Sequence, residues 1–291
     1  MLLEGIIPPL VTPFDEREEP DEQAHRAEVR YLIEKAGVHG LAVGGSTGEG
    51  QSLTCAELRR LVVWTVEEAR GRVPVIAGII ANSTRQAIER GQAVTGFGVA
   101  ALQVTPVHYL FAPDEAHSIR HFATVAETTG MPVIVYNVIP WCYQPAARLA
   151  RMLREVPGII GVKQSAADLK TLADLLLLAP EEARIFSAVD ALLYPSFVLG
   201  AHGSIGAIVT AAPEWSVALW NAVRRGDHQA TLEYHKRLLG VWNAIDGPNL
   251  SANVKTAMEL QGRAGGRPRS PMPSTSAEQR ERIAAALISR Q

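Results

Sequence analysis

A lysine at the end of a short apolar run could act as a nucleophile. The run is Ile159-Ile160-Gly161-Val162, opened by Pro157-Gly158 and followed directly by Lys163. A brief β-branched run between breakers is typical of a buried parallel strand, which places the lysine stem in apolar surroundings. Desolvation disfavours the ammonium, and only the free amine attacks a carbonyl carbon. Lys163 is therefore predicted to form a Schiff base, although a lysine that snorkels from a strand end into water would leave the same pattern.

Hydroxyl groups follow other apolar runs of the same kind. Tyr136 ends the run 132–136, and Ser46 and Thr47 stand in a glycine-rich turn after the run 40–43. A phenol near the amine can relay protons while a carbon–carbon bond forms or breaks. Hydroxyls and backbone N–H groups at the start of a helix suit a carboxylate, so the set predicts chemistry on a 2-oxo acid. Taken singly, the phenol could be a core aromatic, and the turn a plain connection or a phosphate cradle without the P-loop lysine.

These residues need a scaffold that brings distant strand ends together. Apolar runs alternate with helical periodicity eight times, with runs at 3–11, 40–43, 74–78, 100–104, 132–136, 159–162, 183–187 and 203–205. The helices are expected at 21–35, 54–70, 82–96, 114–129, 145–155, 168–178, 190–199 and 213–224. Such alternation predicts an all-parallel sheet, and eight units in about 225 residues favour a closed (β/α)8 barrel over an open doubly wound sheet. In such a barrel the C-terminal strand ends, and the residues above, meet on one face.

The rest of the chain has a different character. Segments 232–245, 251–260 and 277–288 have helical periodicity, and 262–276 is rich in Gly, Pro, Arg and Ser. We therefore expect a barrel over residues 1–224 and a helical C-terminal extension over 225–291. The basic residues Arg263, Arg267 and Arg269 are expected to lie in a solvated loop.

The composition argues against several functional classes. Of the 291 residues, 47% are hydrophobic and 20% are charged, with a net charge of -2 and no concentrated basic stretch for nucleic acid. No apolar span of 18 residues predicts a membrane helix, and without a targeting pattern the cytoplasm is the expected compartment. Cys55 and Cys142 make neither a disulfide framework nor a metal site. His117 and His121 are spaced four apart, but without a carboxylate motif beside them they predict an exposed helix face.

Three stretches together resemble the pyruvate-dependent class I aldolases, the superfamily of N-acetylneuraminate lyase and dihydrodipicolinate synthase. They are Gly44-Gly45-Ser46-Thr47-Gly48-Glu49, Tyr136-Asn137-Val138 and Gly161-Val162-Lys163-Gln164, in a similar order and spacing. The resemblance covers residues 5–224 and continues more weakly through the C-terminal helices. It implies a (β/α)8 barrel that acts on pyruvate and an aldehyde, without a metal or an organic cofactor.

The resemblance also implies roles for single residues. Lys163 would carry the covalent imine, and Tyr136 would shuttle protons while hydrogen-bonded to Thr47. Ser46 and Thr47 would hold the pyruvate carboxylate, and the backbone of Ile205 would line the pocket. Glu49 is expected to be structural, with its carboxylate accepting backbone N–H bonds in the turn. In the family, which forms dimers or tetramers, a second tyrosine reaches in from a neighbouring subunit; here His108 falls on that position, and we assign the relay to Tyr109, one residue later.

Departures from the family pattern bear on the second substrate. Trp141 stands where dihydrodipicolinate synthases have an arginine for a carboxylate, and a tryptophan cannot make that bidentate pair. Asp190 keeps one polar position of the neuraminate lyase branch, whereas Ala191 and Ala207 replace expected polar contacts. With Trp141 in its wall, the second pocket is expected to be more apolar. An apolar or aromatic aldehyde is therefore predicted in place of aspartate semialdehyde or sialic acid.

Several functions share these residues. The leading prediction is an aldolase or lyase that makes or breaks a carbon–carbon bond between pyruvate, or a related 2-oxo acid, and an aldehyde. A dehydratase or decarboxylase of a 2-oxo-3-deoxy sugar acid, or dihydrodipicolinate synthase proper, would use the same imine. A non-enzymatic 2-oxo acid sensor would need neither Lys163 nor Tyr136.

Overall fold

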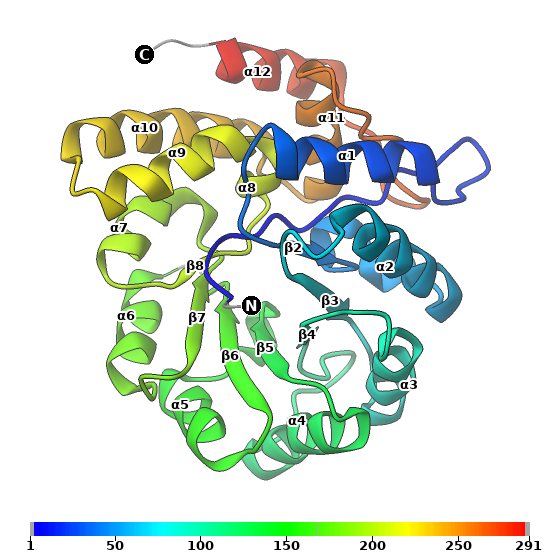
Figure 1. Ribbon diagram of the computed structural model, residues 1–291, viewed down its shortest axis with the longest axis vertical. Helices are drawn as coiled ribbons and strands as arrows, with labels where there is room; N and C mark the ends of the chain where they lie inside the picture. The colour runs from blue at the N-terminus through cyan, green and yellow to red at the C-terminus, as the bar shows by residue number, and fades with distance from the viewer. Residues whose placement is uncertain (1–2, 167, 289–291) are drawn as a thin grey trace.

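Eight parallel strands follow one another around a ring in chain order (Figure 1). The computed structural model describes residues 3–166 and 168–288. Strand β1 pairs with β8, and each strand from β2 to β7 pairs with the next one along the chain. The ring closes where Ala42 N donates to Pro8 O at 3.0 Å and Leu10 N donates to Ala42 O at 2.8 Å. This architecture confirms the predicted (β/α)8 barrel. The strands are β1 (Gly5–Ile6), β2 (Leu41–Val43), β3 (Val75–Ile79), β4 (Ala101–Val104), β5 (Val133–Asn137), β6 (Ile159–Gln164), β7 (Arg184–Ser187) and β8 (Gly203–Ser204).

The first strand is much shorter than the predicted run of residues 3–11. Proline has no backbone N–H to donate to a strand ladder, and Pro8 and Pro9 follow β1 almost directly. Only an isolated parallel bridge between Pro9 and Ala42 continues the pairing.

Helices cover the outside of the barrel, and side chains cap the N-termini of several of them. Thr54 caps α2 in a complete capping box with Glu57, and Ser83 caps α3. The helix predicted over 190–199 is instead a 3₁₀ turn (Asp190–Leu192) followed by α7 (Leu193–Val198). The other helices of the barrel are α1 (Glu22–Glu34), α2 (Cys55–Ala69), α3 (Thr84–Val94), α4 (Glu115–Thr129), α5 (Ala146–Glu155), α6 (Leu169–Leu178), α8 (Ile208–Ala211) and α9 (Pro213–Arg224).

Alternation along the strands separates two apolar layers. Side chains that point inward fill the barrel, while the intervening residues pack against the helices, because successive strand side chains face opposite ways. The inward layer comprises Leu3, Ile7, Ala42, Ile76, Ala101, Ile134, Phe186 and Ile205. Tyr136 lies two residues beyond Ile134 of this layer, and the register pairs Ile134 with Gly161 and Tyr136 with Lys163, so Lys163 points inward near the C-terminal end of the barrel.

The C-terminal extension forms three helices, α10 (His228–Ile245), α11 (Leu250–Leu260) and α12 (Ala277–Ile288), and α10 and α11 lie beside α8 and α9 (Figure 1). One apolar cluster joins both parts of the chain, since it contains Leu193 and Trp220 together with Val254 and Ile283. The division at residue 224 stays a prediction, because the two parts share this core. None of the described helices is long and apolar enough to cross a membrane.

The prediction of a solvated arginine loop is wrong for two of its three residues. Arg263 is buried against Glu28 at 2.5 Å, and Arg269 is largely buried against Glu57 at 2.5 Å. Arg267 is exposed as expected. A buried guanidinium is tolerated only with a well-placed carboxylate, and the partners lie on α1 and α2, far away in sequence. These pairs fasten the segment after α11 to the barrel.

Candidate active site

Lys163 and Tyr136 lie side by side at the C-terminal end of the barrel. The parallel register pairs Tyr136 of β5 with Lys163 of β6, so both side chains point to the barrel axis. Lys163 Nζ lies 3.9 Å from the centroid of the Tyr136 ring, and each residue is 3% exposed. The predicted burial of the lysine is confirmed, and the amine and the phenol occupy one site.

The glycine-rich turn reaches the same site from β2. It forms a 3₁₀ turn over Ser46–Gly48, and the Tyr136 hydroxyl donates to Ser46 Oγ at 3.1 Å. The predicted partner of Tyr136 was Thr47, and the observed partner is the preceding residue, Ser46. Successive side chains of a 3₁₀ turn point about 120° apart, which lets only one of the two hydroxyls face the phenol. Thr47 still lines the cavity beside Ser46.

A cavity of about 500 Å³ opens above Lys163. Strand ends and the loops after them supply one side, with Ser165 and Asp190 besides the residues above. The C-terminal extension supplies the other side through Trp242, Asp246, Pro248, Leu250, Ser251 and Met272. Sequence reasoning missed this second wall, because helical periodicity alone does not say which end of a barrel a helix covers. The break Asp246-Gly247-Pro248-Asn249 between α10 and α11 was the available local signal.

Asp190 lies in the cavity, as the family resemblance implied. Its Oδ1 accepts from the backbone N–H of Ile208 at 2.7 Å. Burial raises the pKa of Asp190 to about 6, although backbone hydrogen bonds and the nearby charge of Lys163 oppose that rise. A carboxyl group held in this way can accept a hydrogen bond from a substrate or give up a proton near neutral pH.

Two predicted site residues lie elsewhere in the subunit. Tyr109 is 64% exposed and lines a separate cavity with Cys55 and Arg90. Trp141 is 67% exposed, its Nε1 donates to His108 O at 3.0 Å, and it is not among the residues that line the cavity above Lys163. Trp141, in the 3₁₀ turn Pro140–Cys142, is therefore not part of this cavity wall within the subunit, and its contact with a second substrate stays a prediction.

Ile205 packs in the barrel interior, and its backbone N–H donates to Ser187 O at 3.2 Å. Its neighbours Gly206 and Ala207 line the cavity in its place. Its proposed contact with substrate through the backbone stays a prediction.

The histidine pair on α4 is split between two environments. His117 is exposed and lies 2.8 Å from Asp114. His121 is buried, contrary to the prediction of an exposed face; its ring contacts Thr84 Oγ1 at 2.9 Å and Thr105 O at 3.2 Å. Burial lowers the pKa of His121. Across residues 3–166 and 168–288, no group of three or more His, Cys, Asp or Glu side chains is arranged to hold a metal ion.

Glu49, at the end of the glycine-rich turn, accepts hydrogen bonds through its carboxylate as predicted, but the donors are far from it in sequence. Its carboxylate accepts from Lys255 Nζ at 2.6 Å and from the backbone N–H of Arg269 at 2.8 Å. The accepted N–H groups were expected within the turn itself, whereas both donors lie in the C-terminal extension. Local sequence carries no signal for contacts over such a separation.

Known proteins resemble this chain in sequence and fold over nearly its whole length. The family model described as the dihydrodipicolinate synthetase family matches residues 2–290. The 4-hydroxy-tetrahydrodipicolinate synthase of Methanopyrus kandleri is 35% identical over 282 residues, which cover 96% of this chain and 93% of that protein. Among solved structures, YagE of E. coli K12, in complex with pyruvate, has a TM-score of 0.92 at 28% identity and covers 99% of this chain and 98% of its own. N-acetylneuraminate lyase from Fusobacterium nucleatum has a TM-score of 0.88 at 26% identity, with 97% of each chain covered.

Proposed function

The chain belongs to the dihydrodipicolinate synthetase family, and on that premise we propose that Lys163 forms a covalent imine with pyruvate or a closely related 2-oxo acid. Membership confirms the class predicted from the sequence, a pyruvate-dependent class I aldolase or lyase. The proposal assigns the step to one lysine and the proton transfers to one phenol.

One observation carries the assignment: the buried amine of Lys163 lies against Tyr136, whose hydroxyl is hydrogen-bonded to Ser46 in the same cavity. The free amine attacks the ketone carbon, and Tyr136 protonates the carbinolamine oxygen, which leaves as water. The resulting iminium withdraws electrons from C3, so the Tyr136 phenolate can take up a C3 proton and leave an enamine. The enamine carbon attacks the aldehyde carbonyl carbon, and Tyr136 returns the proton to the aldehyde oxygen. Hydrolysis of the new iminium frees the product and the amine, and the reverse sequence breaks the bond. The imine itself is the electron sink, so the proposal requires no metal and no organic cofactor.

Ser46 and Thr47 are proposed to hold the carboxylate of the 2-oxo acid. Both line the cavity, and the turn begins a 3₁₀ segment whose first N–H groups have no partner inside that segment. Two hydroxyls and such N–H groups suit two carboxylate oxygens. The ketone carbon would then lie toward Lys163.

The aldehyde is proposed to lack a carboxylate. Asp190 and Asp246 both line the cavity, and among the described lining residues none is an arginine. A second carboxylate would meet like charge without a guanidinium partner. Trp242 and Met272 offer apolar surface beside the two aspartates, so an uncharged aldehyde with a hydroxyl group and an apolar part fits this wall.

Dihydrodipicolinate synthase activity is the second candidate, because relatives at 31–35% identity carry the name 4-hydroxy-tetrahydrodipicolinate synthase. An aldehyde panel with pyruvate separates the two. Consumption of pyruvate with aspartate semialdehyde, but not with hydroxylated or aromatic aldehydes, would favour the second. Release of pyruvate from 2-oxo-3-deoxy sugar acids, or their dehydration without release, would identify the related lyase and dehydratase reactions. Turnover of any substrate would exclude the sensor.

A homo-oligomer in the cytoplasm is part of the proposal. Tyr109 is exposed next to Leu110 and Phe111, which are also exposed large apolar side chains. Such a cluster supports burial against a second copy, from which Tyr109 would join the proton relay of the neighbouring site. The dimer or tetramer is checked by light scattering.

Borohydride trapping tests the imine directly. Pyruvate and borohydride should add one reduced adduct, and peptide mass should place it on Lys163. Lys163→Ala should abolish the adduct, whereas Lys170→Ala, at an exposed lysine of α6 paired with Asp174, should leave it unchanged. An unmodified protein at saturating pyruvate would refute the proposal.

A further inference from the structure

The main chain of the glycine-rich turn is held by the C-terminal extension as well as by the barrel. Ser46 O accepts two hydrogen bonds, one from Glu49 N–H at 3.0 Å and one from Ser251 Oγ at 3.1 Å. Ser251 belongs to α11 and lines the cavity itself. One residue of the extension therefore contacts both the proposed carboxylate-binding turn and the space above it.

Glu49 adds further contacts between the glycine-rich turn and the C-terminal extension. Its backbone is left-handed (φ 55, ψ 35), a strained conformation for a residue with a side chain. The carboxylate is 1% exposed, and its two oxygens are used separately: Oε1 by Lys255 Nζ and Oε2 by Arg269 N–H. Both partners belong to the extension, so the residue that ends the turn is bound to it twice.

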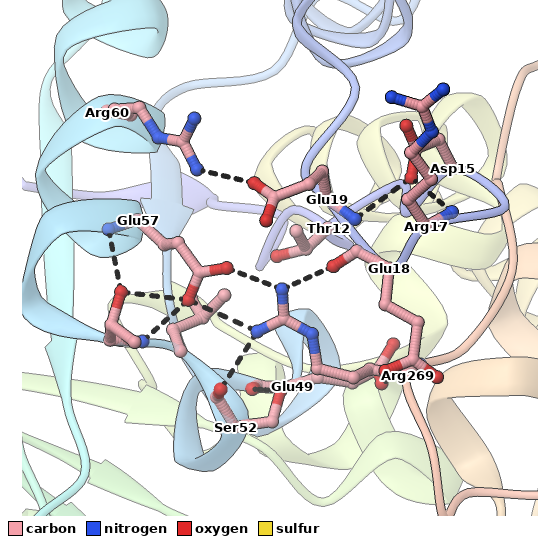
Figure 2. A network of polar contacts seen from close by, with 12 residues as sticks. Thr12, Asp15, Arg17, Glu18, Glu19, Glu49, Ser52, Glu57, Arg60 and Arg269 are labelled. Carbon is pink, nitrogen blue, oxygen red and sulfur yellow. Dashed lines mark hydrogen bonds and ion pairs between the residues drawn. The ribbon is translucent and has the colours of Figure 1, made fainter.

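The extension side of this contact is equally constrained. Lys255 lies one helical turn after Ser251 on α11, so the two side chains share a face. Its ammonium, 2% exposed, also donates to Arg267 O at 2.7 Å. Arg269 donates to Ser52 O at 2.9 Å and pairs with Glu57 (Figure 2). Three residues later the same segment places Met272 in the cavity wall.

We infer that Glu49 and Lys255 are positioning residues that hold the two halves of the cavity in register. By holding Ser46 and Thr47 they fix the position of the 2-oxo acid. By holding Ser251 and Met272 they fix the position of the wall that receives the aldehyde. The inference rests on the proposed function of this cavity. A buried ion pair is often no more stabilising than an apolar pair of the same volume, so stability alone does not account for this one beside the site.

A double substitution separates positioning from stability. Removing one partner leaves an uncompensated buried charge and unfolds many proteins, whereas Glu49→Gln with Lys255→Met removes both charges together. The matched control is Glu28→Gln with Arg263→Met, a second buried pair that joins α1 to the extension and does not line the cavity. Ser251→Ala is an independent variant that leaves every charge in place.

The readout is the pyruvate concentration that gives half-maximal borohydride trapping at Lys163, measured beside thermal unfolding. The Glu49/Lys255 variant should need at least about fivefold more pyruvate, the effect of one lost hydrogen bond, and Ser251→Ala should show a similar increase. The Glu28/Arg263 variant should trap at the wild-type concentration even if it unfolds at a lower temperature.

Wild-type trapping by both the Glu49/Lys255 variant and Ser251→Ala would overturn the inference while leaving the proposed function intact. An equal increase in the Glu28/Arg263 control would also overturn it, because general loosening would then explain the effect. Failure of the wild-type protein to trap pyruvate would instead overturn the proposed function.

Discussion

Replacing Tyr136 with Phe should slow turnover far more than it weakens pyruvate binding. The change removes one oxygen atom, 3.1 Å from Ser46 Oγ, and leaves the ring against Lys163 Nζ. The ring stays packed, so the site keeps its shape. General acid–base catalysis by a positioned group contributes about 10²- to 10⁴-fold, and that is the expected loss in kcat. The Ser46 hydroxyl loses one neutral hydrogen bond, worth about 1 kcal/mol, so pyruvate affinity should fall no more than about fivefold.

Two measurements separate these effects. Steady-state turnover with the best aldehyde of the panel reports kcat, and the concentration dependence of borohydride trapping reports pyruvate affinity and imine formation. Ser46→Ala keeps the phenol but removes its acceptor, and it should reduce kcat much less than Tyr136→Phe does. Equal losses in kcat and pyruvate affinity for Tyr136→Phe would refute the reasoning, since the hydroxyl would then act in binding. A wild-type kcat would show that another group moves the proton.

Two further predictions concern stability. Burial lowers the pKa of His25 to about 4 from 6.5, so the unfolded chain takes up this proton first and stability falls as pH drops from 6.5 through 4. The shift corresponds to roughly 3 kcal/mol, and denaturant titrations at pH 7 and pH 4 should show a correspondingly smaller acid loss for His25→Phe; an identical loss would contradict the assignment. Gly50→Ala places a Cβ 1.8 Å from Gly44 O, so it should distort the turn, lower Tm and reduce imine trapping. Gly240→Ala, in open space on α10, should leave both unchanged or raise Tm, and equal behaviour of the two variants would contradict the steric argument.

The barrel and its reacting pair could be predicted from the sequence because they follow from local periodicity. Apolar runs at intervals of one strand and one helix define the parallel sheet, and strand alternation points Lys163 and Tyr136 to the same axis. The caps Thr54 and Ser83 are signals of the same local kind, since a cap acts within three residues of itself. The first strand was predicted too long because the missing backbone N–H groups of Pro8 and Pro9 were not taken into account.

Only the tertiary structure decided how the site is enclosed. The choice of Ser46 over Thr47 depends on how a 3₁₀ turn is rotated against β5, which no spacing encodes. Trp141 donates its indole N–H to His108 O and does not line the cavity above Lys163, which the sequence could not indicate.

Ion pairs between residues far apart in sequence account for the rest of the cavity wall. Glu49 binds Lys255, and Arg269 binds Glu57, across more than two hundred residues of chain. Helical periodicity predicted the helix α11 but did not indicate which residues it contacts in the folded chain. A buried charge takes whichever partner the folded chain brings to it, because leaving it unpaired is too unfavourable. The sequence by itself therefore determined the barrel and its amine–phenol pair, and the packing of the extension determined the second wall of the cavity above them.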